Sequence, residues 1–221
     1  MIEGIRGLTR LHWPPLDYEL GDAASLGYFK GVVLNAGAGW RDISHLIAGE
    51  LVQQDISIDD YGNIGNDTRV PIDIYSPLDS IPRDDETFDA IICTAVLEHV
   101  INPVECVREM HRVIKRGGHI VVSVPFLQPE HKIPTDYQRY TKDGLIQLLE
   151  HNGFIVDSVL SLFSVYHTIH WIVEEWLRIK NTIVYKFLRV ILLVPLAHMA
   201  HRSKLTDDKI ASAFRVIAHR P

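Results

Sequence analysis

The sequence predicts an α/β fold in which a largely parallel sheet carries helices on both faces. Short apolar runs of strand length alternate along the chain with segments of helical periodicity, and the first buried run, residues 32–34, leads into a turn with glycines at positions 37 and 39. Strands that alternate with helices form parallel βαβ units. A glycine turn after a buried strand is also where α/β proteins bind nucleotide-like ligands.

The composition is that of a globular protein with a real core. The chain has 221 residues, of which 47% are hydrophobic and 23% are charged, as expected for one domain or one domain with an appendage. The formal net charge is -6 and the pI is near 6.0. Nucleic acid is therefore not expected as a partner, because folded nucleic-acid binders normally present a basic face.

The sequence predicts a cytoplasmic protein. Cys93 and Cys106 fall in a strand-like and a helix-like run, so no disulfide is expected and a reducing compartment is favoured. Residues 1–10 contain neither a long apolar stretch nor a cleavage-site pattern, and no signal peptide is expected. We interpret the proline-containing residues 1–30 as a wrapped terminus, with a flap over a ligand site as the alternative.

The first two strands place a carboxylate beside the glycine turn. A helix is expected after the turn, through residues 43–47, and residues 50–57 form a second strand that contains Asp55. Asp55 follows Gly39 by 16 residues. In a βαβ unit this places Asp55 at the carboxyl end of the neighbouring strand, where a carboxylate accepts hydrogen bonds from ribose hydroxyls.

The third and fourth strands follow a loop. Residues 58–69 are rich in Asp, Asn and Gly, a loop composition. Residues 70–74 form a short predicted strand that closes on Asp73, and residues 88–95 form a strand of the continuous, buried type. The segment 96–100 follows this strand directly.

A well-marked helix comes next. Asn102 and Pro103 suit its N-cap and first helical position. One apolar face follows at helical spacing, formed by Val104, Val107, Met110 and Ile114. The basic residues 115–116 suit its last turn, and the glycines 117–118 are expected to end it. Residues 119–126 form the predicted fifth strand.

The last elements bring the predicted strands to seven. The loop 127–140 carries an unusual density of functional side chains. Thr141 is expected to cap a helix that ends at residues 152–153. Residues 154–162 and 213–218 form the sixth and seventh predicted strands.

Several segments carry a more specific signal. Residues 88–100 are FDAIICTAVLEHV, and residues 113–119 are VIKRGGH. Together, over residues 31–161 and the last strand, the chain resembles the class I S-adenosylmethionine-dependent methyltransferases, especially the branch labelled methyltransferase type 11. Residues 131–141, HKIPTDYQRYT, further resemble a subgroup often found near cell-surface polysaccharide genes.

The resemblance implies a Rossmann-like, seven-stranded, mostly parallel sheet with S-adenosylmethionine as the cofactor. It also implies a set of cofactor-binding residues: Asn35, Ala36, Gly37, Ala38 and Gly39 on the methionine and ribose side, Asp55 at the ribose hydroxyls, Ile56, Asp73 and Ile74 around the adenine, and Thr94, Ala95 and Leu97 below the sulfonium. Asp79 is a rival to Asp73. The family usually has aspartate at the position of Asn35 and glycine at that of Arg41. No metal is expected, because a sulfonium donates its methyl group without one.

His131 is the predicted catalytic base. Imidazole titrates near neutral pH, and the loop after the fifth strand lies at the ligand edge of such sheets. His99 is the second candidate. Alternatively, His131 only fixes its loop through Asp136 or Tyr140. Arg139 either binds a phosphate or carboxylate of the acceptor or pairs with Asp136, and we favour the pairing.

Residues 163–205 lie outside the methyltransferase pattern and are predicted to be a helical insertion or cap in a single domain spanning residues 1–221. Residues 178–204 are apolar and basic, with no acidic residue. Two charges and a proline within residues 183–197 make a poor transmembrane helix. The segment is expected to cover the acceptor pocket, to form a homodimer surface or to lie on an anionic membrane.

The sequence therefore predicts a methyltransferase acting on a small-molecule or glycan-type acceptor. A dinucleotide-dependent oxidoreductase shares the glycine turn and Asp55, but residue 42 is aspartate where the third glycine of its motif belongs. A binding or scaffold protein that keeps the fold without catalysis is the other alternative.

Overall fold

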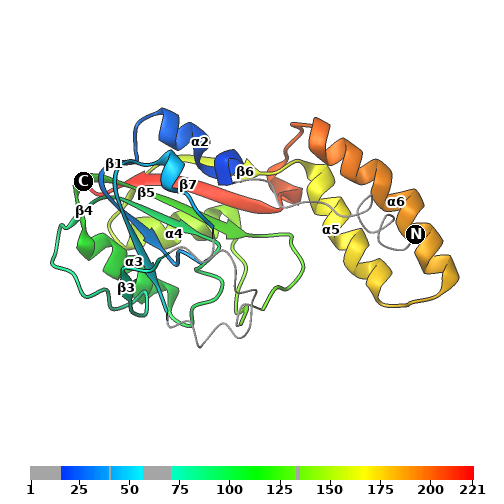
Figure 1. Ribbon diagram of the computed structural model, residues 1–221, viewed down its shortest axis with the longest axis horizontal. Coiled ribbons are helices and arrows are strands. Elements are labelled where there is room, and N and C mark those ends of the chain that lie inside the picture. Colours follow the sequence, from blue (N-terminus) through cyan, green and yellow to red (C-terminus); the bar gives the residue numbers. More distant parts are fainter. Residues whose placement is uncertain (1–15, 40, 57–70, 133–134) are drawn as a thin grey trace. The chain divides into compact units, whose positions relative to one another are not determined.

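The structure is a computed structural model that describes residues 16–39, 41–56, 71–132 and 135–221 (Figure 1). The interpretation of the N-terminus as a wrapped segment or flap falls largely on residues 1–15, outside the described residues. The predicted loop 58–69 and the start of the third predicted strand lie outside them as well.

The sheet has seven strands, as predicted. Their spatial order is β3-β2-β1-β4-β5-β7-β6. The strands are β1 (Lys30–Ala36), β2 (Ala48–Asp55), β3 (Ile74–Tyr75), β4 (Phe88–Thr94), β5 (Ile114–Pro125), β6 (Ile155–Leu162) and β7 (Ala213–His219). The pairs β1–β2, β1–β4, β2–β3 and β4–β5 are parallel. This confirms the Rossmann-like α/β fold.

Both faces of the central strands are buried. The helical elements are α2 (Leu16–Ser25), η1 (Ser44–Leu46), α3 (Pro103–Val113), α4 (Lys142–His151), α5 (Val165–Arg178), α6 (Ile183–Arg202) and η3 (Asp208–Ile210). Leu20 and Ala23 of α2 pack in one cluster with Val33 of β1. Adjacent residues of a strand point to opposite faces. Leu34, which is also fully buried, therefore belongs to the other face of the sheet. Figure 1 shows α2 and α3 on opposite sides of it.

The prediction of a helix through residues 43–47 is wrong. In the described part of the connection between β1 and β2, the only helical element is the single 3-10 turn η1. The connection has eleven residues, 37–47, and must return along the length of β1, because Lys30 pairs with Ala48 at the start of both strands. Seven strand residues span about 23 Å, whereas helical residues advance only about 1.5 Å each. A connection this short cannot hold a helix of several turns and still return.

The end of α3 also differs from the prediction. The helix ends at Val113, and residues 115–118 belong to β5. Its buried residues are Cys106, Val107, Met110 and Val113, whereas Val104 is exposed. Gly118 lies against β4: a Cβ there would be 2.8 Å from the Asp89 carbonyl oxygen. The glycine pair thus allows a register shift between two strands instead of ending a helix.

The other predicted elements agree more closely. The predicted third strand is reduced to two residues, Ile74–Tyr75. Thr141 accepts a hydrogen bond from the Gly144 N–H and caps α4 as predicted. Gly153 follows the end of α4 with a φ of 92°, the left-handed conformation that glycine provides at helix ends.

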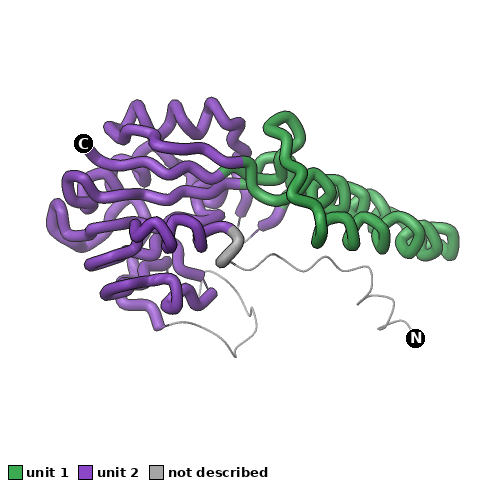
Figure 2. Tube along the Cα trace, turned by 90° about the horizontal axis from the view of Figure 1, so that it is seen from above, with its two compact units in different colours: residues 1–14, 125–130, 161–214 green, residues 15–124, 131–160, 215–221 purple. Residues whose placement is uncertain are grey.

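The chain divides into two compact units (Figure 2). Unit 1 comprises residues 1–14, 125–130 and 161–214, and unit 2 comprises residues 15–124, 131–160 and 215–221. In unit 1, α5 and α6 run side by side. Helices thus occupy the insertion predicted at residues 163–205, while the single domain over residues 1–221 stays a prediction.

Helix α6 has an unusual composition for a helix at a protein surface. Of the helices in the part of the chain that the structure describes, it alone is long and apolar enough to cross a membrane. Its most apolar 18-residue window has a mean hydropathy of 1.7, and 17% of that window is buried. Length and composition are weak grounds for a membrane span, and Lys186, Arg189 and Pro195 interrupt this helix.

A buried ion pair ties α2 to β7 within unit 2. Arg215 is 2% exposed, and its Nη2 donates to Asp22 Oδ2 at 2.7 Å. Its Nη1 donates to Asp22 Oδ1 and to the Glu19 carbonyl oxygen. The pKa of Asp22 is lowered, mainly by the hydrogen bond from Arg215.

Asp22→Asn is expected to lower the free energy of unfolding by about 2 kcal/mol at pH 7, because it leaves the buried guanidinium without its counter-charge. The effect is smaller than for a fully buried pair, since Asp22 is 51% exposed. The folded pKa of Asp22 lies below its ordinary value of 3.8. The stabilisation is therefore present above pH 3.8 and is lost as the pH falls through the lowered pKa. Urea unfolding at pH 7 and pH 3 measures this.

The control is Asp84→Asn, a change at an exposed aspartate. It should leave the free energy of unfolding within about 0.5 kcal/mol of the original. Equal effects of the two substitutions would contradict the assignment to the Arg215 pair.

Candidate functional site

The glycine turn after β1 is docked on the end of β2. Gly37 and Gly39 have φ values of 69° and 59°, which a glycine adopts without strain. The Gly37 N–H donates to Gln54 Oε1 at 3.0 Å, and the Gly39 N–H donates to Asp55 Oδ2 at 2.7 Å. The turn is thus held by side chains of the neighbouring strand instead of opening a helix.

The two glycines have different surroundings. A Cβ at Gly37 would lie 2.4 Å from Val96 Cγ2, whereas a Cβ at Gly39 would have no atom of the described residues within 4 Å. Gly37 therefore lets the backbone pack against the segment that follows β4. Gly39 leaves open space beside the backbone at the carboxyl end of the sheet, the edge at which α/β proteins bind ligands.

Asp55 lies where the sequence predicted it, at the carboxyl end of β2. Its side chain is buried, and besides the Gly39 N–H it accepts the Ile56 N–H at 2.7 Å. A carboxylate has about four acceptor positions. These two bonds therefore orient the carboxylate at the end of β2. Ile56 itself is half-buried.

Asn35 is engaged in a buried pair. Its Nδ2 donates to Gln53 Oε1 at 2.7 Å, and both side chains are buried. The two residues are also register partners of β1 and β2. A neutral amide pair thus occupies the position where the resembling family usually has a carboxylate. Neighbouring Ala36 and Ala38 are buried beside it.

The residues predicted around the adenine support the sheet edge. Asp73 Oδ2 accepts the Gln53 N–H at 2.8 Å, and Ile74 is buried in the core. Asp79 is exposed. These contacts are structural, and the adenine roles stay predictions.

The end of β4 forms a tight turn. Ala95 has a φ of 55°, uncommon for a residue with a Cβ. Its N–H donates to the Ser123 carbonyl oxygen of β5 at 2.9 Å. Thr94 is half-buried and Leu97 is fully buried. Thr94 and Ala95 are therefore accessible at the end of β4, whereas Leu97 is packed in the core, and their role as a wall below the sulfonium stays a prediction.

His131 lies in a cluster of ionisable side chains. Its Nε2 is 3.4 Å from Glu98 Oε1, and its Nδ1 is 3.7 Å from Asp136 Oδ2. The rings of His131 and His99 meet edge to face, with centroids 4.9 Å apart. The structure therefore brings together both predicted base candidates, from segments 32 positions apart in the sequence.

Asp136 is paired with Arg139, as favoured from the sequence. Arg139 donates to both carboxylate oxygens, at 2.5 Å for Nη2 to Oδ2. Asp136 also accepts the backbone N–H of His131 at 2.8 Å. Burial alone would raise the pKa of Asp136, but the hydrogen bonds from Arg139 and His131 lower it.

Sequence reasoning missed the role of Glu98. It was noted as part of a motif but not as a site residue, yet it is fully buried in the centre of the cluster. Burial and the Glu98 charge raise the pKa of Tyr140 well above its usual range. The signal that could have revealed this cluster is the place of its residues in the sequence. Glu98 and His99 follow β4, and His131 follows β5. The ends of adjacent parallel strands lie side by side.

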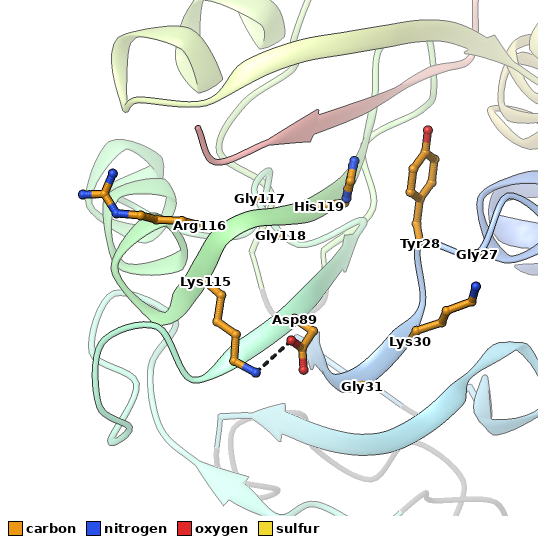
Figure 3. Close-up of a pocket in the computed structure, with 10 residues that line it drawn as sticks. All are labelled: Gly27, Tyr28, Lys30, Gly31, Asp89, Lys115, Arg116, Gly117, Gly118 and His119. Atoms are coloured by element: carbon orange, nitrogen blue, oxygen red, sulfur yellow. Dashed lines mark hydrogen bonds and ion pairs between the residues drawn. The ribbon is translucent and has the colours of Figure 1, made fainter.

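A separate cavity lies at the opposite edge of the sheet. It has a volume of about 360 Å³ and is lined by the first residues of β1, β4 and β5 together with the segment before β1 (Figure 3). Lys115 Nζ and Asp89 Oδ1 pair across it at 2.8 Å. The predicted cofactor residues are at the carboxyl ends of the strands, so this cavity is distinct from that site.

Comparisons with known proteins bear on the predicted family. Residues 42–122 match the family described as Methyltransferase domain. The chain is 29% identical over 93 residues to a demethylmenaquinone methyltransferase of Clavibacter sepedonicus, with 41% of this chain and 38% of that protein covered. It is 27% identical over 143 residues to a ubiquinone biosynthesis O-methyltransferase of Alkalilimnicola ehrlichii, with 62% and 50% covered. The chain spans half or less of the length of these curated relatives.

Solved structures share the fold at low identity. The [4+2]-cyclase SpnF superposes with a TM-score of 0.61 at 18% identity, covering 96% of this chain and 85% of that one. A putative methyltransferase in complex with the activator Trm112 of Haloferax volcanii has a TM-score of 0.60 at 15% identity, covering 99% and 93%. A Haemonchus contortus phosphoethanolamine N-methyltransferase, solved with S-adenosylhomocysteine, has a TM-score of 0.58 at 13% identity, covering 99% and 56%.

Fold and family together confirm the resemblance. The match of residues 42–122 to the methyltransferase domain family and the seven-stranded sheet support assignment to the class I S-adenosylmethionine-dependent methyltransferases. S-adenosylmethionine is the cofactor of this class. The orienting hydrogen bonds on Asp55 and the open space beside Gly39 fit a ligand that carries ribose hydroxyls.

Gly37→Ala is expected to lower the free energy of unfolding by at least about 2 kcal/mol, because a methyl group there meets Val96 and the φ is positive. Gly39→Ala has the same backbone strain but no clash, so a loss of about 1 kcal/mol is expected. Urea unfolding of the two variants checks this order, and a reversed order would contradict the described packing of the turn.

Proposed function

We propose that this protein transfers a methyl group to a small-molecule or glycan-type acceptor. The observation that carries the proposal is the hydrogen bond between the Gly39 N–H and Asp55, which holds the turn and the carboxylate together at the ends of adjacent parallel strands. When bound, S-adenosylmethionine supplies a methyl group from its sulfonium to an acceptor nucleophile, which loses a proton as S-adenosylhomocysteine is left.

The chain's residues bind and orient the cofactor in this proposal. Asp55 accepts the ribose hydroxyls, and the backbone from Asn35 to Gly39 lies along the methionine and ribose side. Ile56, Asp73 and Ile74 lie around the adenine. Thr94 and Ala95 form the wall below the sulfonium, so that in-line positioning accounts for most of the rate.

The acceptor belongs to the small-molecule class in this proposal. Two relatives are named as demethylmenaquinone and ubiquinone biosynthesis methyltransferases, so an apolar ring is one case to test beside glycans. The predicted base role of His131 stays a prediction, because its Nε2 faces the buried Glu98.

Two alternatives make different ligand predictions. A dinucleotide-dependent oxidoreductase would use a glycine turn that opens a helix, whereas the turn here leads only to η1. A non-catalytic scaffold would bind neither cofactor. The cyclase among the fold neighbours makes a direct ligand test necessary, because fold alone does not define the reaction.

The test is calorimetric titration with S-adenosylhomocysteine and with NAD. S-adenosylhomocysteine should bind, and Asp55→Asn should weaken this binding about tenfold or more, because one charged acceptor of the ribose hydroxyls is lost. Asp84→Asn should bind as the original chain does. Binding of NAD alone would contradict the proposal, and binding of neither ligand would favour the scaffold.

We further propose that the protein is cytoplasmic and lies on anionic membranes through residues 178–204. Large apolar side chains of α6 are exposed, among them Ile183 at 79% and Phe187 at 65%. The segment has six lysines and arginines and no acidic residue. Apolar side chains beside basic ones are what a helix needs to bind at an anionic bilayer surface.

Phe187→Glu is expected to reduce binding to phosphatidylglycerol-containing vesicles at least about tenfold, because it replaces an inserted aromatic ring with a negative charge. Co-sedimentation measures this. Ile101→Glu, at an apolar residue outside α6 that is 74% exposed, should have no effect. Absence of vesicle binding by the original chain, together with a dimer in light scattering, would support the homodimer surface instead.

A further inference from the structure

Glu98 is a buried carboxylate whose oxygens have no hydrogen bond to any residue that the structure describes. The residue is fully buried at the carboxyl end of β4. Among the described residues, neither Oε1 nor Oε2 finds a hydrogen-bond partner. A buried ionised carboxylate left this way is strongly destabilising. Such a group therefore points to a missing positive partner.

Two histidines each face this carboxylate with their Nε2 atom. Glu98 Oε1 lies 3.6 Å from His99 Nε2 and 3.4 Å from His131 Nε2. One ligand atom from each of the three residues lies within 4.8 Å of those of the other two. All three residues belong to unit 2.

From these positions we propose that Glu98, His99 and His131 bind a divalent transition-metal ion. Ligands at about 2.0–2.1 Å around a tetrahedral ion are about 3.3 Å apart. The two distances from Glu98 are close to this value. The remaining pair, one ligand nitrogen from each histidine, lies within 4.8 Å.

The outer contacts of both rings support this assignment. His99 Nδ1 contacts the carbonyl oxygen of Thr135, which can only accept, so Nδ1 carries a proton and Nε2 is the ring nitrogen that faces Glu98. His131 Nδ1 faces the carboxylate of Asp136. Histidines that bind metals usually donate the outer N–H to a backbone carbonyl or a carboxylate.

The donor set selects the kind of ion. Two imidazoles and one carboxylate suit zinc and other first-row transition metals, whereas magnesium prefers oxygen ligands. Three protein ligands leave a fourth position open for water or an oxygen of a ligand. This inference revises the expectation of no metal. It also excludes the base role of His131 while the ion is bound, because both use Nε2.

The test uses the full chain, dialysed against a chelator and titrated with Zn²⁺ by calorimetry and with Co²⁺ by visible absorption. One equivalent should bind. Glu98→Gln and His131→Gln should each weaken binding at least about tenfold. His151→Gln, at an exposed histidine of α4, should bind as the original chain does. Circular dichroism confirms that each variant is folded.

No stoichiometric binding by the original chain would overturn the inference, as would equal binding by the chain and both ligand variants. Since Glu98→Gln replaces a buried carboxylate that lacks a hydrogen bond in the described residues with a neutral amide, it should stay folded even if His131→Gln does not. No methyl donor or acceptor is present in the titration. A chain that binds S-adenosylhomocysteine but no metal overturns this inference alone.

Discussion

The eleven-residue connection between β1 and β2 is the constraint on which the predicted cofactor site depends. Because it is too short for a helix, the backbone N–H groups of the turn are not gathered at a helix N-terminus. Gln54 and Asp55 of the next strand bind them instead. The position of the turn is therefore set by β2, and a change at the end of β2 also changes the turn.

Much of the fold could be predicted because its signals are local. The apolar run of β4, the proline at the start of α3 and the Thr141 cap depend on neighbours in the sequence. The helix after Gly39 could not be excluded without knowing the register, since its absence follows from the pairing of Lys30 with Ala48. Likewise, the sequence around Gly118 is typical of a helix end, whereas in the structure Gly118 lies against the neighbouring strand.

The candidate site likewise contains residues that could be predicted from the sequence and residues that could not. Asp55 could be predicted, because its distance from Gly39 in the sequence is tied to the βαβ unit. The role of Glu98 could not be predicted, because it depends on the contact with His131, whose segment follows a different strand. Two buried ionisable side chains, Arg215 and Glu98, also differ in their hydrogen bonds. Arg215 has a carboxylate partner, whereas neither carboxylate oxygen of Glu98 has a hydrogen-bond partner among the described residues.

Pro195 bears on the proposed membrane contact of α6. Proline has no backbone N–H, so the helical hydrogen bond to the carbonyl of Ile191 is not formed. In the hydrocarbon interior such a carbonyl finds no donor from solvent, whereas among lipid headgroups water supplies one. The missing amide thus favours a helix that lies parallel to the membrane plane over one that crosses it.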